Sequence, residues 1–249
     1  MRDLIELTDV EEPAWPLVAA DLDASAVHVD VLPVDPEGAR ASLLQMQITA
    51  RSRLGALVLN CGGLVLDSGW LRVYGSPGPG PLTGPPALRE VPSLADVNGF
   101  PERFDPLWRP RDGGLVVGHD VLGGVFVLNG AEPRAPGRPG EPGEMVYFAP
   151  DSLRWEALET GYGPWLTWLL TGGMEQFYET LRWSGWRAES GALTGTQALS
   201  FTPFLWSAEA RRDLAATRRR AVPLAELLGV QRHFCQELDS VDPGFLGDV

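Results

Sequence analysis

The chain has 249 residues, of which 44% are hydrophobic and 21% charged, a composition ordinary for a globular protein with a sizeable core. Its net charge of −13 argues against general affinity for nucleic acid, which depends on basic groups that neutralise phosphates. All twenty basic residues are arginine, a bias typical of a GC-rich genome. The chain therefore lacks the lysine that Schiff-base enzymes, pyridoxal phosphate enzymes, P-loop proteins and protein kinases require.

Two short helices are predicted at 4–7 and 15–22, with Pro13 close to the start of the second. Residues 27–31 alternate apolar and polar side chains, which predicts a strand with one buried face. A helix follows at 38–49. The run from 55 to 66 reads as two strands, 56–60 and 64–66, joined at Cys61-Gly62-Gly63, and 71–74 predicts another strand.

Three β-branched and aromatic runs between 113 and 155, each bounded by turn residues, predict a meander of antiparallel strands at 115–118, 125–128 and 145–148. With the strands predicted at 56–60, 64–66 and 71–74 they should form one largely antiparallel twisted sheet of about six strands. The Pro/Gly-rich segments 75–90 and 131–143 are typical either of domain linkers or of surface loops. We favour loops, and therefore a single domain over 1–249, because the flanking strands need partners.

After Trp155 the sequence pattern predicts mainly helices. Residues 164–170 predict a buried helix, 174–181 an amphipathic helix, and 199–203 an aromatic strand. A basic helix is expected at 208–220 and a last helix at 224–238. Helices at both ends around a meander indicate an α+β fold.

Residues 1–6 lack a signal-peptide pattern, and the longest apolar run is too short to cross a membrane. Two cysteines make no disulfide framework. We therefore expect a cytoplasmic protein that binds neither nucleic acid nor membranes.

No recognisable spacing of catalytic or metal-binding residues is present. His28, His119 and His233 are dispersed, so we expect no metal and no cofactor. Cys61 sits in a tight turn without a nucleophile signature and is interpreted as inert. Asp67 and Asp120 follow strands and could meet across the sheet, but turn aspartates at the surface are the favoured interpretation.

Several motifs resemble those of an uncharacterised bacterial domain-of-unknown-function family over most of the chain. They are Gly62-Gly63-Leu64, Asp67-Ser68-Gly69-Trp70, Gly123-Gly124-Val125-Phe126, Val146-Tyr147-Phe148-Ala149-Pro150-Asp151 and Ser200-Phe201-Thr202-Pro203. The order of strand, Gly-Gly turn, strand, Val-Tyr-Phe-x-Pro-Asp and tryptophan over about 70–181 is also similar to the SUKH superfamily. That similarity implies a SUKH-like fold and a relation to bacterial toxin-immunity proteins.

The favoured function is accordingly a non-enzymatic binding protein, of the immunity type, that neutralises a basic toxin. Its expected contact residues lie at strand ends, where loops present side chains to solvent: Asp67, Trp70, Asp120, Asp151 and Trp155. Two alternatives stay open. One is a hydrolase-like enzyme with a dispersed site near His119 and Asp120, and the other is a structural or homo-oligomeric protein.

Overall fold

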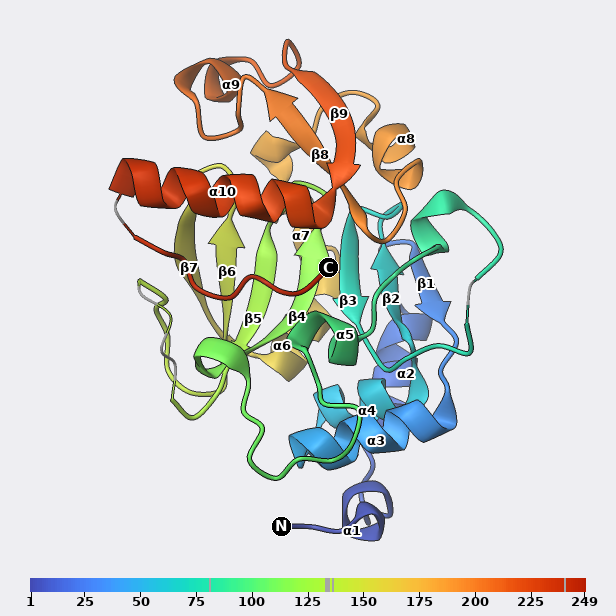
Figure 1. Cartoon of the computed structure of the whole chain (residues 1–249). Helices are drawn as coiled ribbons and strands as arrows, with labels where there is room; N and C mark the ends of the chain where they lie inside the picture. Colours follow the sequence, from blue (N-terminus) through green and yellow to red (C-terminus); the bar gives the residue numbers. More distant parts are fainter. Residues whose placement is uncertain (81, 133–134, 136, 240) are drawn as a thin grey trace.

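The computed structural model describes residues 1–80, 82–132, 135, 137–239 and 241–249 (Figure 1). The two predicted loops, 75–90 and 131–143, include residues 81, 133, 134 and 136, which lie outside the described residues. Within the described part, no helix is long and apolar enough to span a bilayer.

Seven antiparallel strands form the main sheet in chain order, β1-β2-β3-β4-β5-β6-β7. They are β1 (Val29–Leu32), β2 (Gly63–Leu66), β3 (Leu71–Tyr74), β4 (Gly114–Asp120), β5 (Val125–Asn129), β6 (Glu144–Ala149) and β7 (Arg154–Gly161). The five central strands are almost wholly buried, whereas β1 and β7 form the edges. The predicted α+β fold with an antiparallel sheet is confirmed, with seven strands in place of about six.

Helices cover both faces of this sheet (Figure 1). The amino-terminal part of the chain supplies four helices: α1 (Leu4–Thr8), α2 (Trp15–Asp23), α3 (Pro36–Met46) and α4 (Arg53–Asn60). On the far face, α6 (Tyr162–Leu170) packs against β6 and β7, and α7 (Gly173–Phe177) and the 3-10 turn η3 (Glu179–Leu181) follow it. On the near face lie α5 (Leu94–Asn98), α10 (Leu224–Asp239) and the extended segment 241–249. Two further 3-10 turns are η1 (Pro86–Leu88) and η2 (Arg111–Gly113).

A small carboxyl-terminal unit caps the edge of the sheet that is formed by the β2–β3, β4–β5 and β6–β7 turns. It comprises α8 (Trp186–Gly191), β8 (Gln197–Thr202), α9 (Ala208–Arg212) and β9 (Arg218–Pro223), with β8 and β9 antiparallel. Its contacts reach all three turns at that edge. Leu199 N donates to Val121 O at 2.8 Å, Ser190 Oγ to Ser68 O at 2.9 Å, and Arg211 Nη2 to Asp151 O at 2.8 Å. The same hydrophobic cluster includes buried residues of both sheets.

Two predicted elements are wrong in kind. The strand expected at 56–60 belongs to α4, whose buried, nearly all-apolar sequence has no periodicity that separates a strand from a core helix. Ser52 caps this helix by accepting a hydrogen bond from Gly55 N. The basic helix expected at 208–220 ends at Arg212 in α9, and Arg218–Pro223 is a strand that pairs with β8.

Candidate functional site

The β2–β3, β4–β5 and β6–β7 turns lie together at one end of the strands, because successive turns of an antiparallel meander alternate between the two ends. We call this end the turn edge of the sheet. This edge carries all five residues predicted to bind a partner. The expectation that these side chains face solvent is wrong for three of them. Trp70 and Asp120 are 0% exposed, and Asp67 is 8% exposed. The reason is that α8, the β8–β9 hairpin and α10 cover this edge (Figure 1).

The β2–β3 turn places the Asp67 carboxylate beside two arginines. Asp67, Ser68 and Gly69 have φ angles of 50°, 61° and 81°, a left-handed run that reverses the chain sharply. Ser190 Oγ holds the turn through the carbonyl of Ser68. The Asp67 carboxylate then lies 2.7 Å from Arg182 Nη2 and 3.7 Å from Arg187 Nε.

Aromatic rings surround the Arg182 guanidinium. Its Cζ lies 4.0 Å from the Trp186 ring centroid, 4.9 Å from that of Trp70 and 5.5 Å from that of Tyr178. Trp70 lies at the centre of these rings and meets both Tyr178 and Trp186 edge to face. Burial lowers the pKa of Arg182, and the negative charge of Asp67 opposes that shift. The guanidinium is therefore held by cation–π contacts and by one ion pair.

A cleft of about 650 Å³ opens above this pair. Asp67, Arg182, Trp186 and Arg187 form part of its wall, and other lining residues come from the segment before β1, from the end of α6 and from α7: Ala26, Val27, His28, Thr171, Gly172, Glu175 and Glu179. Arg187 stacks on Trp186 with its Cζ 4.3 Å from the ring centroid. We call this feature the acidic cleft.

Two carboxylates at the acidic cleft lack partners. Glu175 and Glu179 are exposed, and within the described residues neither makes an ion pair or a side-chain hydrogen bond. They lie four residues apart in the α7–η3 segment. The ion pair between Asp67 and Arg182 is, by contrast, already satisfied. The free negative charge of the cleft therefore comes from these two glutamates.

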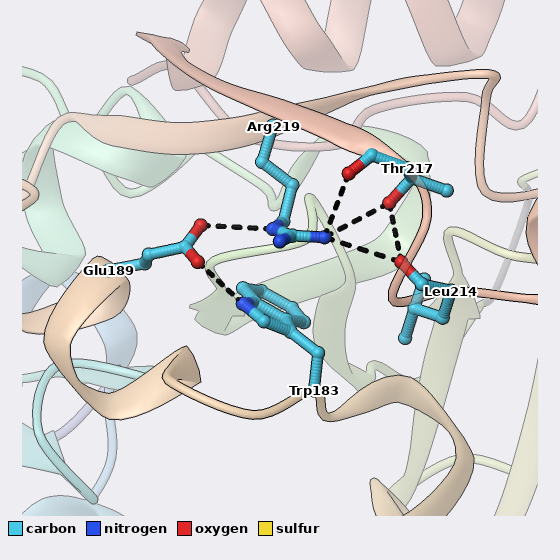
Figure 2. Close-up of polar contacts among 5 residues, drawn as sticks. All are labelled: Trp183, Glu189, Leu214, Thr217 and Arg219. Carbon is cyan, nitrogen blue, oxygen red and sulfur yellow. Dashed lines mark hydrogen bonds and ion pairs between the residues drawn. The ribbon is translucent and has the colours of Figure 1, made fainter.

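Figure 2 shows how α8, one wall of the acidic cleft, is fixed to the β8–β9 hairpin. Glu189 Oε1 accepts a hydrogen bond from Trp183 Nε1 at 2.7 Å, and Glu189 Oε2 accepts one from Arg219 Nε at 3.0 Å. Arg219 also donates to Leu214 O and to Thr217, and its Cζ lies 4.6 Å from the Trp183 ring centroid. This network of internal contacts orders the wall.

The rings of Trp70, Tyr178 and Trp186 form what we call the aromatic cluster, and Asp120 is buried next to Tyr178. Its Oδ2 accepts hydrogen bonds from Tyr147 Oη at 2.7 Å and from Tyr178 Oη at 2.9 Å. Its Oδ1 accepts from the backbone N of Leu122 and of Gly124, both at 2.8 Å. Burial raises the pKa of Asp120, and the four hydrogen bonds oppose that shift. All of these contacts are internal, which makes Asp120 a structural residue of the β4–β5 turn.

His119 points to the opposite face of β4, because neighbouring residues in a strand alternate. Its Nε2 donates to Leu246 O at 2.7 Å, so its Nδ1 accepts from Tyr74 Oη at 2.8 Å. Complete burial lowers the pKa of His119 to about 4. His119 and Asp120 thus belong to two separate, fully buried networks. This arrangement does not provide the shared site that the hydrolase-like alternative needs.

Asp151 and Trp155 lie at the β6–β7 turn. Trp155 is partly buried, packs edge to face on Phe148 and donates from Nε1 to Pro243 O at 3.0 Å. Asp151 accepts a hydrogen bond from Arg211 through its backbone carbonyl. Among the described residues, no hydrogen bond, ion pair or ring contact joins Asp151 or Trp155 to the aromatic cluster, which connects Asp67, Trp70 and, through Tyr178, Asp120. The predicted set therefore divides into two places.

Sequence reasoning missed Glu175, Glu179, Arg182 and Arg187 as cleft residues. The signal that points to the two arginines is the stretch Arg182-Trp183-Ser184-Gly185-Trp186-Arg187, which alternates cations with large aromatic rings around a turn. Exposed glutamates in a short helix leave no comparable signal in a sequence.

Two chemistries considered from the sequence lack a site in the described part of the chain. No group of three or more His, Cys, Asp or Glu residues there is placed to hold a metal ion. Cys61 is 0% exposed, and burial raises the pKa of its thiol to about 12, far from that of a nucleophilic thiolate.

Comparison with known proteins adds a family. A model of the family described as "Protein of unknown function DUF2625" matches residues 4–227, which include every residue of the acidic cleft. A protein of Escherichia coli (strain K12) named YbfG is 38% identical over 233 residues, 93% of this chain and 96% of that protein. A Haemophilus influenzae protein is 32% identical over 205 residues, 82% of this chain and 83% of that protein. No solved structure matches the chain, and no comparison shows the SUKH resemblance.

Proposed function

The chain belongs to the DUF2625 family, as the sequence resemblance predicted, and we propose that it is a cytoplasmic binding protein of the immunity type that takes a basic protein surface into the acidic cleft. The observation that carries this proposal is a pair of exposed carboxylates, Glu175 and Glu179, that have no partner in the described part of the chain and share the cleft with a wall of aromatic and arginine side chains. The SUKH-like motif order and the net charge of −13 support the same function.

The cleft suits a lysine or arginine side chain of a partner for two physical reasons. An incoming cation meets two carboxylates that hold no other cation, so no existing ion pair has to break. The aromatic wall is already ordered by Arg182 and Arg187, so little side-chain entropy is lost on binding. Charge complementarity of this kind speeds association and is weakened by salt.

The test compares two charge-matched double variants, with a fluorescently labelled octa-arginine peptide as the probe. Glu175→Arg/Glu179→Arg reverses the charge of the cleft. Glu102→Arg/Glu237→Arg makes the same net change at exposed glutamates that do not line it. At low salt we expect the cleft variant to weaken binding about tenfold or more, a change of about 1.4 kcal/mol, and the control variant to weaken it less than threefold. Equal losses in both variants would show that only net charge matters and would overturn the proposal.

A second arm tests the immunity role in cells. The first step is to inspect the genes beside this one for a toxic basic protein. Co-expressed with the chain, such a protein should be neutralised by the wild type and by the control variant but not by the cleft variant, and the absence of any such gene would count against the immunity role. Equal protection by both double variants would move the interface away from the acidic cleft.

A further inference from the structure

The segment Val241–Val249, which we call the strap, crosses the near face of the sheet from the end of α10 toward α5 without forming a helix or strand (Figure 1). It lies beyond the residues that the family model matches and away from the acidic cleft. Most hydrogen bonds of its backbone go to side chains of other elements, as they do when a protein binds an extended peptide.

Four side chains of other elements and the backbone carbonyl of Val97 hydrogen-bond to the backbone of the strap. Trp155 Nε1 donates to Pro243 O at 3.0 Å, Arg232 Nη2 to Gly244 O at 2.7 Å, and His119 Nε2 to Leu246 O at 2.7 Å. In the other direction, Phe245 N donates to Asp112 Oδ2 at 2.6 Å, and Asp248 N donates to Val97 O at 2.9 Å. These donors and acceptors come from η2, α5, β4, β7 and α10. Recognition of main-chain groups by fixed partners is how proteins bind extended peptides.

Two side chains of the strap fill apolar sites, and two glycines adjoin them. Leu246 is 1% exposed and Phe245 8% exposed, with the Arg111 guanidinium 4.7 Å from the Phe245 ring centroid. Gly244 and Gly247 have φ angles of 79° and 108°. A Cβ at Gly247 would lie 2.9 Å from His119 Cε1, and a Cβ at Gly244 would lie 2.7 Å from Asp112 Oδ2. The groove thus fits the order Gly-Phe-Leu-Gly.

The strap leaves space on both sides. A cavity of about 400 Å³ between the strap and the β6–β7 turn is lined by Phe148, Leu153, Trp155, Cys235 and Val241, among others. A second cavity of about 280 Å³ lies between α10 and residues 246–249. The groove is therefore wider than the segment that occupies it.

We propose that this groove is a peptide-binding site for an extended partner segment with a Phe-Leu pair between small residues, and that the strap occupies it in cis. The strap itself shows the ligand chemistry: a backbone held by the hydrogen bonds named above, two apolar anchors and two glycines. A tethered strap acts at an effective concentration in the millimolar range, so a partner peptide binds weakly until the strap is released.

The experiment uses the full chain with a specific protease sequence inserted directly before Val241, and a labelled synthetic peptide of residues 241–249 as the probe. Fluorescence anisotropy should show weak binding before cleavage. After cleavage and dialysis, we expect saturable binding at least tenfold tighter. A peptide with Ala in place of Phe and Leu should bind at least tenfold more weakly than the native peptide, and Trp155→Phe in the protein should lower affinity.

Circular dichroism accompanies each step, so that folding and binding are read separately. A cleaved protein that stays folded but binds the native and alanine peptides equally overturns the proposal. If cleavage unfolds the protein, the strap is an integral part of the core and not a displaceable ligand, which also overturns the proposal.

Discussion

Replacing Asp120 with alanine should cost the fold about 4 kcal/mol. The change removes the acceptor of four hydrogen bonds, and the donors left behind are two tyrosine hydroxyls and two backbone N–H groups in a fully buried site. Each unsatisfied buried donor costs about 1–3 kcal/mol. Losing the carboxylate relieves its own desolvation, which is the main cause of its raised pKa, and this offsets part of the loss.

Asp120→Asn is the matched control, because its side-chain oxygen still accepts from Leu122 N and Gly124 N. We expect it to cost about 1–2 kcal/mol, since only the bonds to the tyrosines change. Urea unfolding followed by tryptophan fluorescence measures both variants. The raised pKa of Asp120 also sets the direction of a pH effect. The folded state holds this proton more tightly than the unfolded state, so the free energy of unfolding increases as the pH falls through the folded-state pKa. The advantage of the wild type over Asn should widen on acidification. An alanine variant within about 1 kcal/mol of the wild type, or a narrowing advantage, would refute this reasoning.

Three other predictions concern stability. The pKa of His119 falls from its ordinary 6.5 to about 4, so the unfolded state binds the proton first, and about 3 kcal/mol should be lost between pH 6.5 and 4. His119→Gln should flatten that part of the stability profile, and an unchanged slope would contradict the prediction. Glu189→Gln and Arg219→Met should show a coupling energy of about 1 kcal/mol in a double-mutant cycle by urea unfolding, and additive effects would exclude the network of Figure 2 as a stabilising unit. Trp70→Ala should cost about 3–5 kcal/mol, measured in the same way, because its ring is fully buried, and a loss below 1 kcal/mol would be inconsistent with that core position.

Most strands of the sheet were predictable because their signals are local, although β7 (Arg154–Gly161) was not predicted. Turn residues bound β3, β4, β5 and β6, and their apolar runs are too short for typical helices, so pattern and length agree. The run at 53–60 is apolar on nearly every side, and neither pattern separates a core helix from a buried strand. The opposite failure occurs at Arg218–Pro223, where three successive arginines suggest a solvated helix. Pairing with β8, a tertiary contact, makes this segment a strand.

The places of the five predicted residues in the sheet were predictable, but their exposure was not, and only Asp67 among them lines the acidic cleft. Alternation in a meander correctly places Asp67, Asp120 and Asp151 at turns on one edge. The sequence carries no sign that residues 186–223 fold back over that edge, because such coverage depends on contacts between segments more than a hundred residues apart, such as Ser190 with Ser68. Exposure at a turn is a safe inference only where nothing else packs on the turn.

The burial of Asp67 decides which residues can test function. Asp67 is ion-paired to Arg182, which stacks on Trp70 and Tyr178, and Tyr178 donates to Asp120. Removing Asp67 would leave a buried guanidinium unpaired and disturb this whole chain of contacts, so a loss of partner binding would not distinguish an interface from a damaged core. Glu175 and Glu179 are exposed and make no side-chain contact of this kind, which means that reversing their charge leaves the aromatic cluster in place. If the acidic cleft binds a basic partner, Glu175→Arg/Glu179→Arg should lose binding at unchanged thermal stability, whereas Asp67→Ala should lose both. A melting temperature of the double variant below that of the wild type would show that these glutamates stabilise the fold, contrary to the exposure that assigns them to a partner.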